Sequence, residues 1–124
     1  MKVLKIGFVG TRTDRAGEMT EFLEEVLGLQ PDKTGDDTWA YRLPDGSLAE
    51  VFGPSQNEHF TTGPVVEFLV EDVAAATEEL RAAGVEIVFG PERSDEAGLD
   101  WTHFRAPDGN VYGVIGMDDR SAAS

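Results

Sequence analysis

The chain has 124 residues, of which 24 are Asp or Glu and 10 are Lys or Arg, and it contains no cysteine. This length suffices for one compact domain with a buried core, and a formal charge of −14 repels phosphate backbones, so we expect no nucleic-acid partner. Disulfides and thiolate metal sites are excluded, and no apolar run approaches the roughly 20 residues that span a bilayer, so we expect no membrane partner and a cytoplasmic location.

The first half of the chain predicts a strand, a helix and a β-hairpin. Asp14 is expected to cap a helix whose apolar residues recur at helical spacing, and Gly28 is expected to end it. Pro44-Asp45-Gly46 is a strong turn signal between two strand-like segments. In chain order the predicted elements are a strand at 5–11, a helix between the Asp14 cap and the Gly28 stop, a weak strand at 30–34, and hairpin strands at 38–43 and 47–52.

The second half predicts the same order of elements. Asp72 is expected to cap its helix, and Gly84 is expected to end it. A polar stretch at 55–63 separates the two halves without a longer linker. The predicted elements are a strand at 65–70, a helix at 73–83, a strand at 85–89, and hairpin strands at 101–106 and 110–115.

Each half ends in the same sequence pattern. Residues 44–53 read PDGSLAEVFG and residues 107–116 read PDGNVYGVIG. Two copies of one supersecondary unit in so short a chain predict a single domain built from two β-α-β-β-β pseudo-repeats, at about 3–53 and 64–116, with a short polar tail from residue 118. The copies differ at one informative place, because Glu50 in the first aligns with Gly113 in the second.

Strand alternation predicts which side chains of the hairpins share a face. If residues 44–47 form the turn, Tyr41 lies opposite Glu50, and Phe104 lies opposite Gly113 in the second hairpin, so that His103 points away from that face. The face of the first hairpin would then carry six residues, namely Trp39, Tyr41, Leu43, Leu48, Glu50 and Phe52.

A carboxylate on that apolar face needs an explanation. Burying the Glu50 carboxylate without a partner costs several kcal/mol, so a cation, a hydrogen-bond donor or a water-filled cavity is expected beside it. We favour a cavity between the two units. The alternatives are that this face is exposed to solvent, or that Arg42 or Arg105 neutralises Glu50.

The paired units, with FLEEVLGL in the first helix, VVEFLVEDVAAATEELRAAGVEI in the second unit and FRAPDGNVYGVIG at the end, resemble the vicinal oxygen chelate superfamily. That superfamily includes glyoxalase I, extradiol dioxygenases, methylmalonyl-CoA epimerase, and the bleomycin- and fosfomycin-resistance proteins. The resemblance covers residues 5–116. It implies an α+β fold in which two tandem βαβββ modules form a curved mixed sheet around a cleft.

In metal-dependent members of that superfamily, each module supplies one ligand from its first strand and one from its last. Carried over by position, these places fall at Gly7, Glu50, Val65 and Gly113, and only Glu50 has a side chain that can bind a metal. A catalytic ion takes about three protein ligands, so we expect no metal and no cofactor.

Three other polar residues bear on this site. Glu67 should share a face with Val65, which makes an acidic pair with Glu50 possible inside the cleft, and the alternative is an exposed strand residue. His59 and His103 are interpreted as surface or hydrogen-bonded side chains and not as ligands.

A cleft without its metal but with aromatic walls resembles the bleomycin-resistance branch, which binds and sequesters a drug and commonly dimerises. The resemblance implies a homodimer that binds an aromatic or cationic compound such as an antibiotic. The alternative is a metal-independent glyoxalase-like lyase or isomerase with Glu50 as the catalytic general base, and a third reading is a non-catalytic dimerising module. The predicted ligand-binding residues are Trp39, Tyr41, Glu50, Phe52, Glu67 and Phe104.

Overall fold

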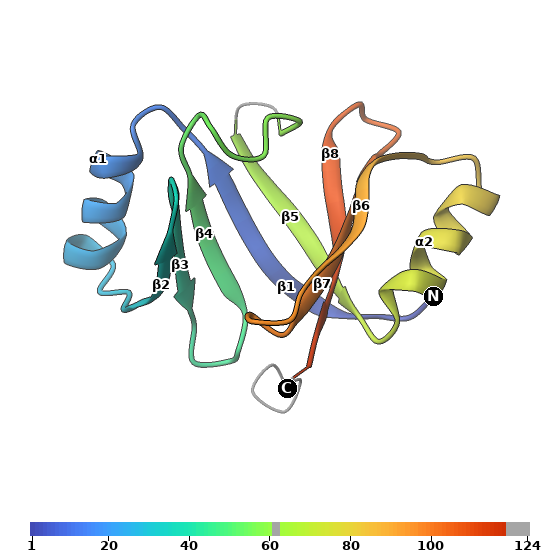
Figure 1. Ribbon diagram of the computed structural model, residues 1–124, viewed down its shortest axis with the longest axis horizontal. Coiled ribbons are helices and arrows are strands. Elements are labelled where there is room, and N and C mark those ends of the chain that lie inside the picture. Colours follow the sequence, from blue (N-terminus) through green and yellow to red (C-terminus); the bar gives the residue numbers. More distant parts are fainter. Residues whose placement is uncertain (61–62, 119–124) are drawn as a thin grey trace.

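Eight strands form one curved, mixed sheet in the computed structural model, which describes residues 1–60 and 63–118 (Figure 1). Across the sheet the strands run in the order β2-β3-β4-β1-β5-β8-β7-β6. The predicted polar tail lies outside the described residues apart from Asp118. The elements are β1 (Val3–Arg12), α1 (Ala16–Glu21), the π-helical turn η1 (Phe22–Val26), β2 (Pro31–Gly35), β3 (Thr38–Arg42), β4 (Leu48–Phe52), β5 (Gly63–Val70), α2 (Val73–Ala82), β6 (Glu86–Ser94), β7 (Leu99–Arg105) and β8 (Val111–Met117).

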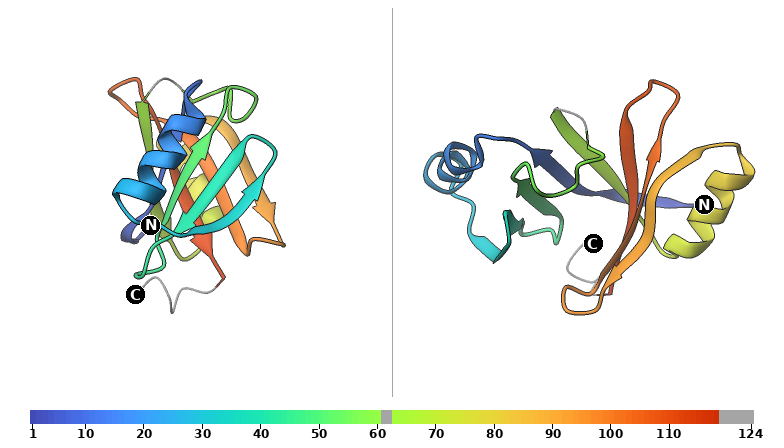
Figure 2. Two further views of the ribbon diagram at one scale, coloured as in Figure 1. Left: turned by 90° about the vertical axis from the view of Figure 1, so that its left-hand side faces the viewer. Right: turned by 45° about the horizontal axis from the view of Figure 1, so that its top comes forward.

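The sheet consists of two modules with the same order of elements, which confirms the predicted α+β fold of tandem βαβββ modules. The first strands of the modules, β1 and β5, pair antiparallel in the centre of the sheet. Each also pairs in parallel with the last strand of its own module, β1 with β4 and β5 with β8. The helices lie at opposite ends of the sheet, and the two views of Figure 2 show the sheet bending between its two halves.

The helices cover the outer face of each half. Asp72 caps α2 as predicted, because its side chain accepts a hydrogen bond of 3.0 Å from the Ala75 N–H. The predicted Asp14 cap is wrong: Arg15 occupies the N-cap position of α1, and no side chain caps this helix. Of the residues in α1 and η1, only Leu23 is buried, so few apolar contacts hold the first helix to the sheet.

Both hairpins have loops of three residues, and the predicted register is wrong by one residue. In the first hairpin the Leu43 N–H donates to the Ser47 carbonyl at 2.8 Å, and the Gly46 N–H donates to the Leu43 carbonyl at 2.9 Å. Gly46 has a φ of 86°, so the loop is a type I turn followed by a left-handed glycine. Ala40 therefore lies opposite Glu50, and Tyr41 points to the other face.

The second hairpin repeats this geometry. The Ala106 N–H donates to the Asn110 carbonyl at 2.9 Å, and Gly109 has a φ of 85°. His103 therefore lies opposite Gly113, and Phe104 lies one position along the strand on the other face. The prediction that Phe104 faces Gly113 and His103 points away is wrong for the same reason: one residue of loop length reverses which side of the strand each residue occupies.

Candidate functional site

A cavity of about 220 Å³ lies between β4 and β7 on the inner side of the sheet. Its wall is largely aromatic and aliphatic and is formed by Phe8, Phe52, Phe60, Leu99, Trp101 and Ile115, with Ala97 at the rim. Its polar lining consists of Asn57, Ser94, Glu50, Glu67 and His103. Few polar groups in a mostly apolar cavity are typical of a small-molecule site.

A second hollow, of about 500 Å³, adjoins the cavity. Strands β2, β3 and β4 line one side of it, and the loop between β6 and β7 lines the other. Glu50, Ala97 and Leu99 line both hollows. Glu50 therefore lies at the passage between the inner cavity and the outer hollow.

Glu50 faces the cavity from β4, and its carboxylate accepts no hydrogen bond from any residue that the structure describes. Burial raises the pKa of Glu50 to about 7; the neighbouring carboxyl of Glu67 adds to this rise, and the Arg42 charge opposes it. The Arg42 guanidinium itself donates to the Gly46 carbonyl at 3.0 Å and lies 3.7 Å from Asp32. Neutralisation of Glu50 by a direct ion pair with Arg42, one of the alternatives from the sequence, does not occur.

Glu67 lies deeper, on β5 opposite Gly113 of β8, and is only 2% exposed. Its Oε2 lies 3.1 Å from His103 Nε2, whereas its Oε1 is buried without a hydrogen-bond partner. Burial raises the pKa of Glu67 well above its ordinary value. A Cβ added to Gly113 would lie 2.6 Å from Glu67 Cγ, so the Glu67 side chain fits only because residue 113 is glycine.

Two histidines extend the polar group away from the cavity. His103 Nδ1 lies 2.7 Å from His59 Nε2, and the His59 ring stacks on Phe89 at a centroid distance of 5.1 Å. Burial lowers the pKa of both histidines to about 4, so both rings are neutral at pH 7. The interpretation of these residues as hydrogen-bonded side chains agrees with the structure, but sequence reasoning missed that His103 faces the cavity.

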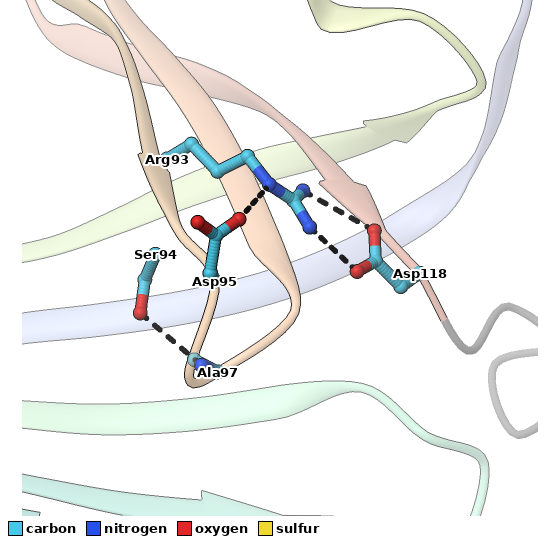
Figure 3. A network of polar contacts seen from close by, with 5 residues as sticks. All are labelled: Arg93, Ser94, Asp95, Ala97 and Asp118. Carbon is cyan, nitrogen blue, oxygen red and sulfur yellow. Dashed lines mark hydrogen bonds and ion pairs between the residues drawn. The ribbon is translucent and has the colours of Figure 1, made fainter.

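An arginine in β6 forms a network of polar contacts (Figure 3) beside Ser94 and Ala97, which line the cavity. The Arg93 guanidinium donates to Asp95 at 2.7 Å and to both carboxylate oxygens of Asp118, at 3.2 and 2.6 Å. Next to it, the Ala97 N–H donates to the Ser94 hydroxyl at 3.1 Å. These contacts attach the loop between β6 and β7, which carries Ala97, to the end of β8.

Half of the predicted ligand-binding residues line the cavity and half do not. Glu50, Phe52 and Glu67 lie in it. Tyr41 is fully buried on the outer face beneath η1, where its hydroxyl donates to Glu24 at 2.7 Å. The remaining two, Trp39 and Phe104, also pack on the outer face.

The predicted placement of Trp39, Tyr41 and Phe104 in the cleft is therefore wrong, because the one-residue register shift turns these three side chains outward. Trp101, which was not among the predicted residues, provides an aromatic wall instead. A three-residue loop for each Pro-Asp-Gly turn would have predicted both changes.

Comparisons with known proteins agree with this architecture. Residues 5–113 match the model of the Glyoxalase/Bleomycin resistance protein/Dioxygenase superfamily. The chain belongs to this superfamily. No curated protein matches the sequence.

Solved structures of this superfamily share the fold at low sequence identity. The Mn(II)-bound glyoxalase from Novosphingobium aromaticivorans has a TM-score of 0.72 at 18% identity over 93% of this chain and 39% of that chain. A variant of Streptomyces coelicolor methylmalonyl-CoA epimerase, in complex with 2-nitronate-propionyl-CoA, has a TM-score of 0.66 at 15% identity over 94% of this chain and 99% of that chain. A superfamily member from Vibrio splendidus 12B01 has a TM-score of 0.66 at 18% identity, over 93% and 99% of the two chains.

The residues of this superfamily member do not fit the divalent ion that the superfamily implies. No group of three or more His, Asp or Glu side chains within residues 1–60 and 63–118 is arranged to hold a metal. Three of the four places of the expected ligands hold Gly7, Val65 and Gly113, the fourth holds Glu50, and the Glu67 carboxyl fills the space beside Gly113. Both ring nitrogens of His103 are engaged by Glu67 and His59.

Proposed function

We propose that this protein binds a compact aromatic or cationic organic molecule in the inner cavity without a metal ion. The observation that carries the proposal is the Glu50 carboxyl, which faces the cavity and has no hydrogen-bond partner among the described residues. A cationic or hydrogen-bond-donating ligand would supply the partner that the protein does not. Sequestration of such a compound, for example an antibiotic, is the biological role that we propose for this binding.

The walls of the cavity support an aromatic or cationic ligand. Trp101, Phe52 and Phe60 offer ring faces and edges for stacking and cation–π contact. The net charge of −14 raises the local concentration of cations around the whole protein. The volume of about 220 Å³ suits a compact molecule, and the adjoining hollow of about 500 Å³ provides room for a substituent beyond Glu50.

A thermal-shift screen of small aromatic and cationic compounds, run in EDTA and again with Mn²⁺ or Zn²⁺, tests this function. We expect stabilising compounds whose effect is the same in both conditions. Calorimetry on a compound found in this way should show that Glu50→Gln weakens a cationic ligand by about 1–3 kcal/mol, the scale of a charged hydrogen bond. Glu25→Gln removes a charge from the exposed surface of η1 and should leave the affinity unchanged. If Glu50→Gln changes neither the affinity for the compound nor its turnover, the cavity assignment is refuted.

A second candidate is a metal-independent lyase or isomerase of the glyoxalase type. It is favoured by the raised pKa of Glu50, about 7, because a general base is most effective when its pKa lies near the working pH. In that case Glu50→Gln should preserve binding while turnover falls by roughly a hundredfold or more. Progress curves and calorimetry on the same compound distinguish this outcome from loss of an electrostatic anchor.

We also propose a homodimer that uses the outer face of β1. Neighbouring apolar side chains of this strand are exposed, including Ile6 at 54% and Val9 at 40%. Both helices lie at the ends of the sheet and leave its centre uncovered (Figure 1). Light scattering after size-exclusion chromatography should give the mass of two chains for wild type and of one chain for Ile6→Asp. Val26→Asp, on the exposed side of η1, should remain a dimer, and a wild-type mass of one chain would contradict the proposal.

No helix among the described residues is long and apolar enough to cross a membrane.

A further inference from the structure

We infer that Asn57 recognises the ligand of the inner cavity, and that it favours a ligand with a hydrogen-bond donor next to an acceptor, such as a carboxamide. The inference deepens the proposed function and rests on it, because it names a second group of the ligand besides the one that faces Glu50. It is carried by the Asn57 side chain, which lines the cavity and makes no hydrogen bond with any residue that the structure describes.

Asn57 lies in the loop between β4 and β5 and has a backbone conformation that few residue types adopt. Its φ is 50°, in the left-handed region that favours glycine and, among the other residue types, asparagine and aspartate. The backbone alone would therefore explain an asparagine at this position. What distinguishes a further role is where the carboxamide lies and what it contacts.

Asp37 provides the comparison, because it is the other described non-glycine residue with a positive φ, 55°. Its carboxylate is bonded within the protein, where it accepts from the Ser55 N–H at 3.1 Å and from the Ser55 hydroxyl at 2.7 Å. Asn57 is half-buried at the cavity, and its carboxamide has no such bond. Its two N–H donors and its carbonyl acceptor are therefore left for a ligand.

Hydrogen bonds on both sides hold the backbone of Asn57. Arg12 of β1 donates to the Gln56 carbonyl at 3.0 Å and to the Pro54 carbonyl at 2.6 Å. The Phe60 N–H donates to the Asn57 carbonyl at 2.8 Å, and the Phe60 side chain is buried in the cavity wall. A residue whose backbone is fixed before binding loses little conformational freedom when a ligand binds, so more of its hydrogen-bond energy contributes to affinity.

The neighbours of Asn57 define the rest of the ligand. Phe52, Phe60 and Trp101 line the same cavity and suit an aromatic frame, and Glu50 suits a cationic or donor group. A carboxamide on this frame pairs with the Asn57 carboxamide by donating to its carbonyl and accepting from its NH₂. The class is a small aromatic amine that also carries a carboxamide. 3-(Aminomethyl)benzamide belongs to it, and benzylamine is the same compound without the carboxamide.

NMR titration of the ¹⁵N-labelled protein with these two compounds tests the inference. 3-(Aminomethyl)benzamide should bind about five- to tenfold more tightly than benzylamine, the scale of a neutral hydrogen bond, and should shift the side-chain NH₂ signals of Asn57. The NH₂ signals of Asn110, the other asparagine of the chain, should not move, because Asn110 is exposed in the second hairpin. Equal affinities for the two compounds, or unmoved Asn57 signals, would overturn the inference.

Asn57→Gly separates the carboxamide from the backbone conformation, because glycine adopts a φ of 50° without strain. This variant should bind benzylamine as wild type does and lose the preference for the carboxamide, whereas Asn110→Gly should keep it. Its midpoint of urea denaturation should not fall, since no contact within the protein is lost, and Asp37→Gly should lower the midpoint. A preference that survives in Asn57→Gly, or a midpoint as low as that of Asp37→Gly, would mean that the Asn57 side chain is structural.

The paired compounds separate this inference from the proposed function. If benzylamine binds in the cavity and the carboxamide adds no affinity, the role of Asn57 is refuted and the binding function stands. If neither compound binds, the class of aromatic amines with a carboxamide is wrong, and the thermal-shift screen still decides whether the cavity binds other compounds. If Asn57→Gly does not fold, the wild-type titration is decisive.

Discussion

The two carboxyl groups of the cavity, Glu50 and Glu67, show how different environments assign different chemistry to one residue type. Glu50 lies at the passage between two hollows and accepts no hydrogen bond from the described residues. Glu67 is 2% exposed and is bonded to His103, which is bonded in turn to His59. Burial therefore raises the pKa of Glu50 to about 7 and raises the pKa of Glu67 well above its ordinary value.

The difference originates in the two modules. In the first module β4 carries the carboxyl group, and the facing residue of β1 is Gly10. In the second module the order is reversed, because the carboxyl comes from β5 and the facing residue of β8 is Gly113. Each strand pair thus holds one glutamate and one glycine. Only at Gly113 does the glutamate fill the space that the glycine leaves, since a Cβ added to Gly10 would meet the Phe8 ring instead.

The largest expected effect is a pH-dependent stabilisation by Glu50→Gln. The pKa of Glu50 rises from 4.5 to about 7 on folding, so the folded protein binds this proton more tightly than the unfolded chain does. Its contribution to stability is complete below about pH 4.5 and is lost as the pH rises through 7. Glu50→Gln should therefore raise the free energy of unfolding at pH 8 by up to about 3 kcal/mol and leave it unchanged at pH 4.

Urea denaturation of both proteins at pH 4, 6 and 8 measures this difference. His59 and His103 contribute with the opposite sign, because their lowered pKa values make the fold lose stability as the pH falls towards 4. That contribution is common to wild type and variant and cancels in the comparison. If the difference in the free energy of unfolding between the two proteins does not depend on pH, folding does not change the pKa of Glu50.

The next effect concerns the glycine that faces Glu67. Gly113→Ala places a Cβ 2.6 Å from Glu67 Cγ and should destabilise the protein by about 1–3 kcal/mol, the scale of overpacking a core. Gly17→Ala is the matched control, since nothing lies within 4 Å of its added Cβ, and it should be neutral or stabilising by up to about 1 kcal/mol. In a Glu67→Ala background Gly113→Ala should cost little, and an unrelieved cost would contradict the proposed contact.

Substitutions of Tyr41 and Trp101 distinguish the role of the outer face of the sheet from that of the cavity. Tyr41→Phe removes a hydroxyl that donates to Glu24 and should cost about 1 kcal/mol of stability, with no change in the affinity of a cavity ligand. Trp101→Ala should weaken the same ligand, because Trp101 lines the cavity. Chemical denaturation and calorimetry on both variants provide the check, and equal effects on binding would mean that the ligand site lies elsewhere.

The smallest effect is expected at the rim of the cavity. Arg93→Ala removes the contacts to Asp95 and Asp118 and should speed hydrogen exchange of the Gly98 and Asp118 amides, while the melting temperature changes little. Arg81→Ala, which removes an exposed ion pair on α2, should leave exchange at this loop unchanged. Unaltered exchange in Arg93→Ala would show that backbone hydrogen bonds alone hold the loop.

Much of the fold can be read from local patterns in the sequence. The repeated Pro-Asp-Gly turns, the cap at Asp72 and the stop at Gly84 each depend on a few neighbouring residues, and the second module follows them closely. The first helix departs from its pattern: a π-helical turn replaces part of the α-helix, and Arg15 stands at the N-cap position without a capping side chain.

By itself, the sequence determined that two similar modules form the chain, that Glu50 differs from its counterpart Gly113, and that Gly7, Val65 and Gly113 supply no metal ligand. These are properties of residue identity and order, and they do not depend on how strands pair. The family resemblance rests on the same information.

Only the tertiary structure decided which side chains meet in the cavity. Whether a Pro-Asp-Gly loop contains three or four residues changes the strand register by one, and this reverses the faces of Tyr41 and His103. The meeting of His59, His103 and Glu67 joins a loop and two strands that are distant in sequence. No local pattern encodes such a contact, because its free energy arises from burial and from hydrogen bonds that exist only when the sheet is complete.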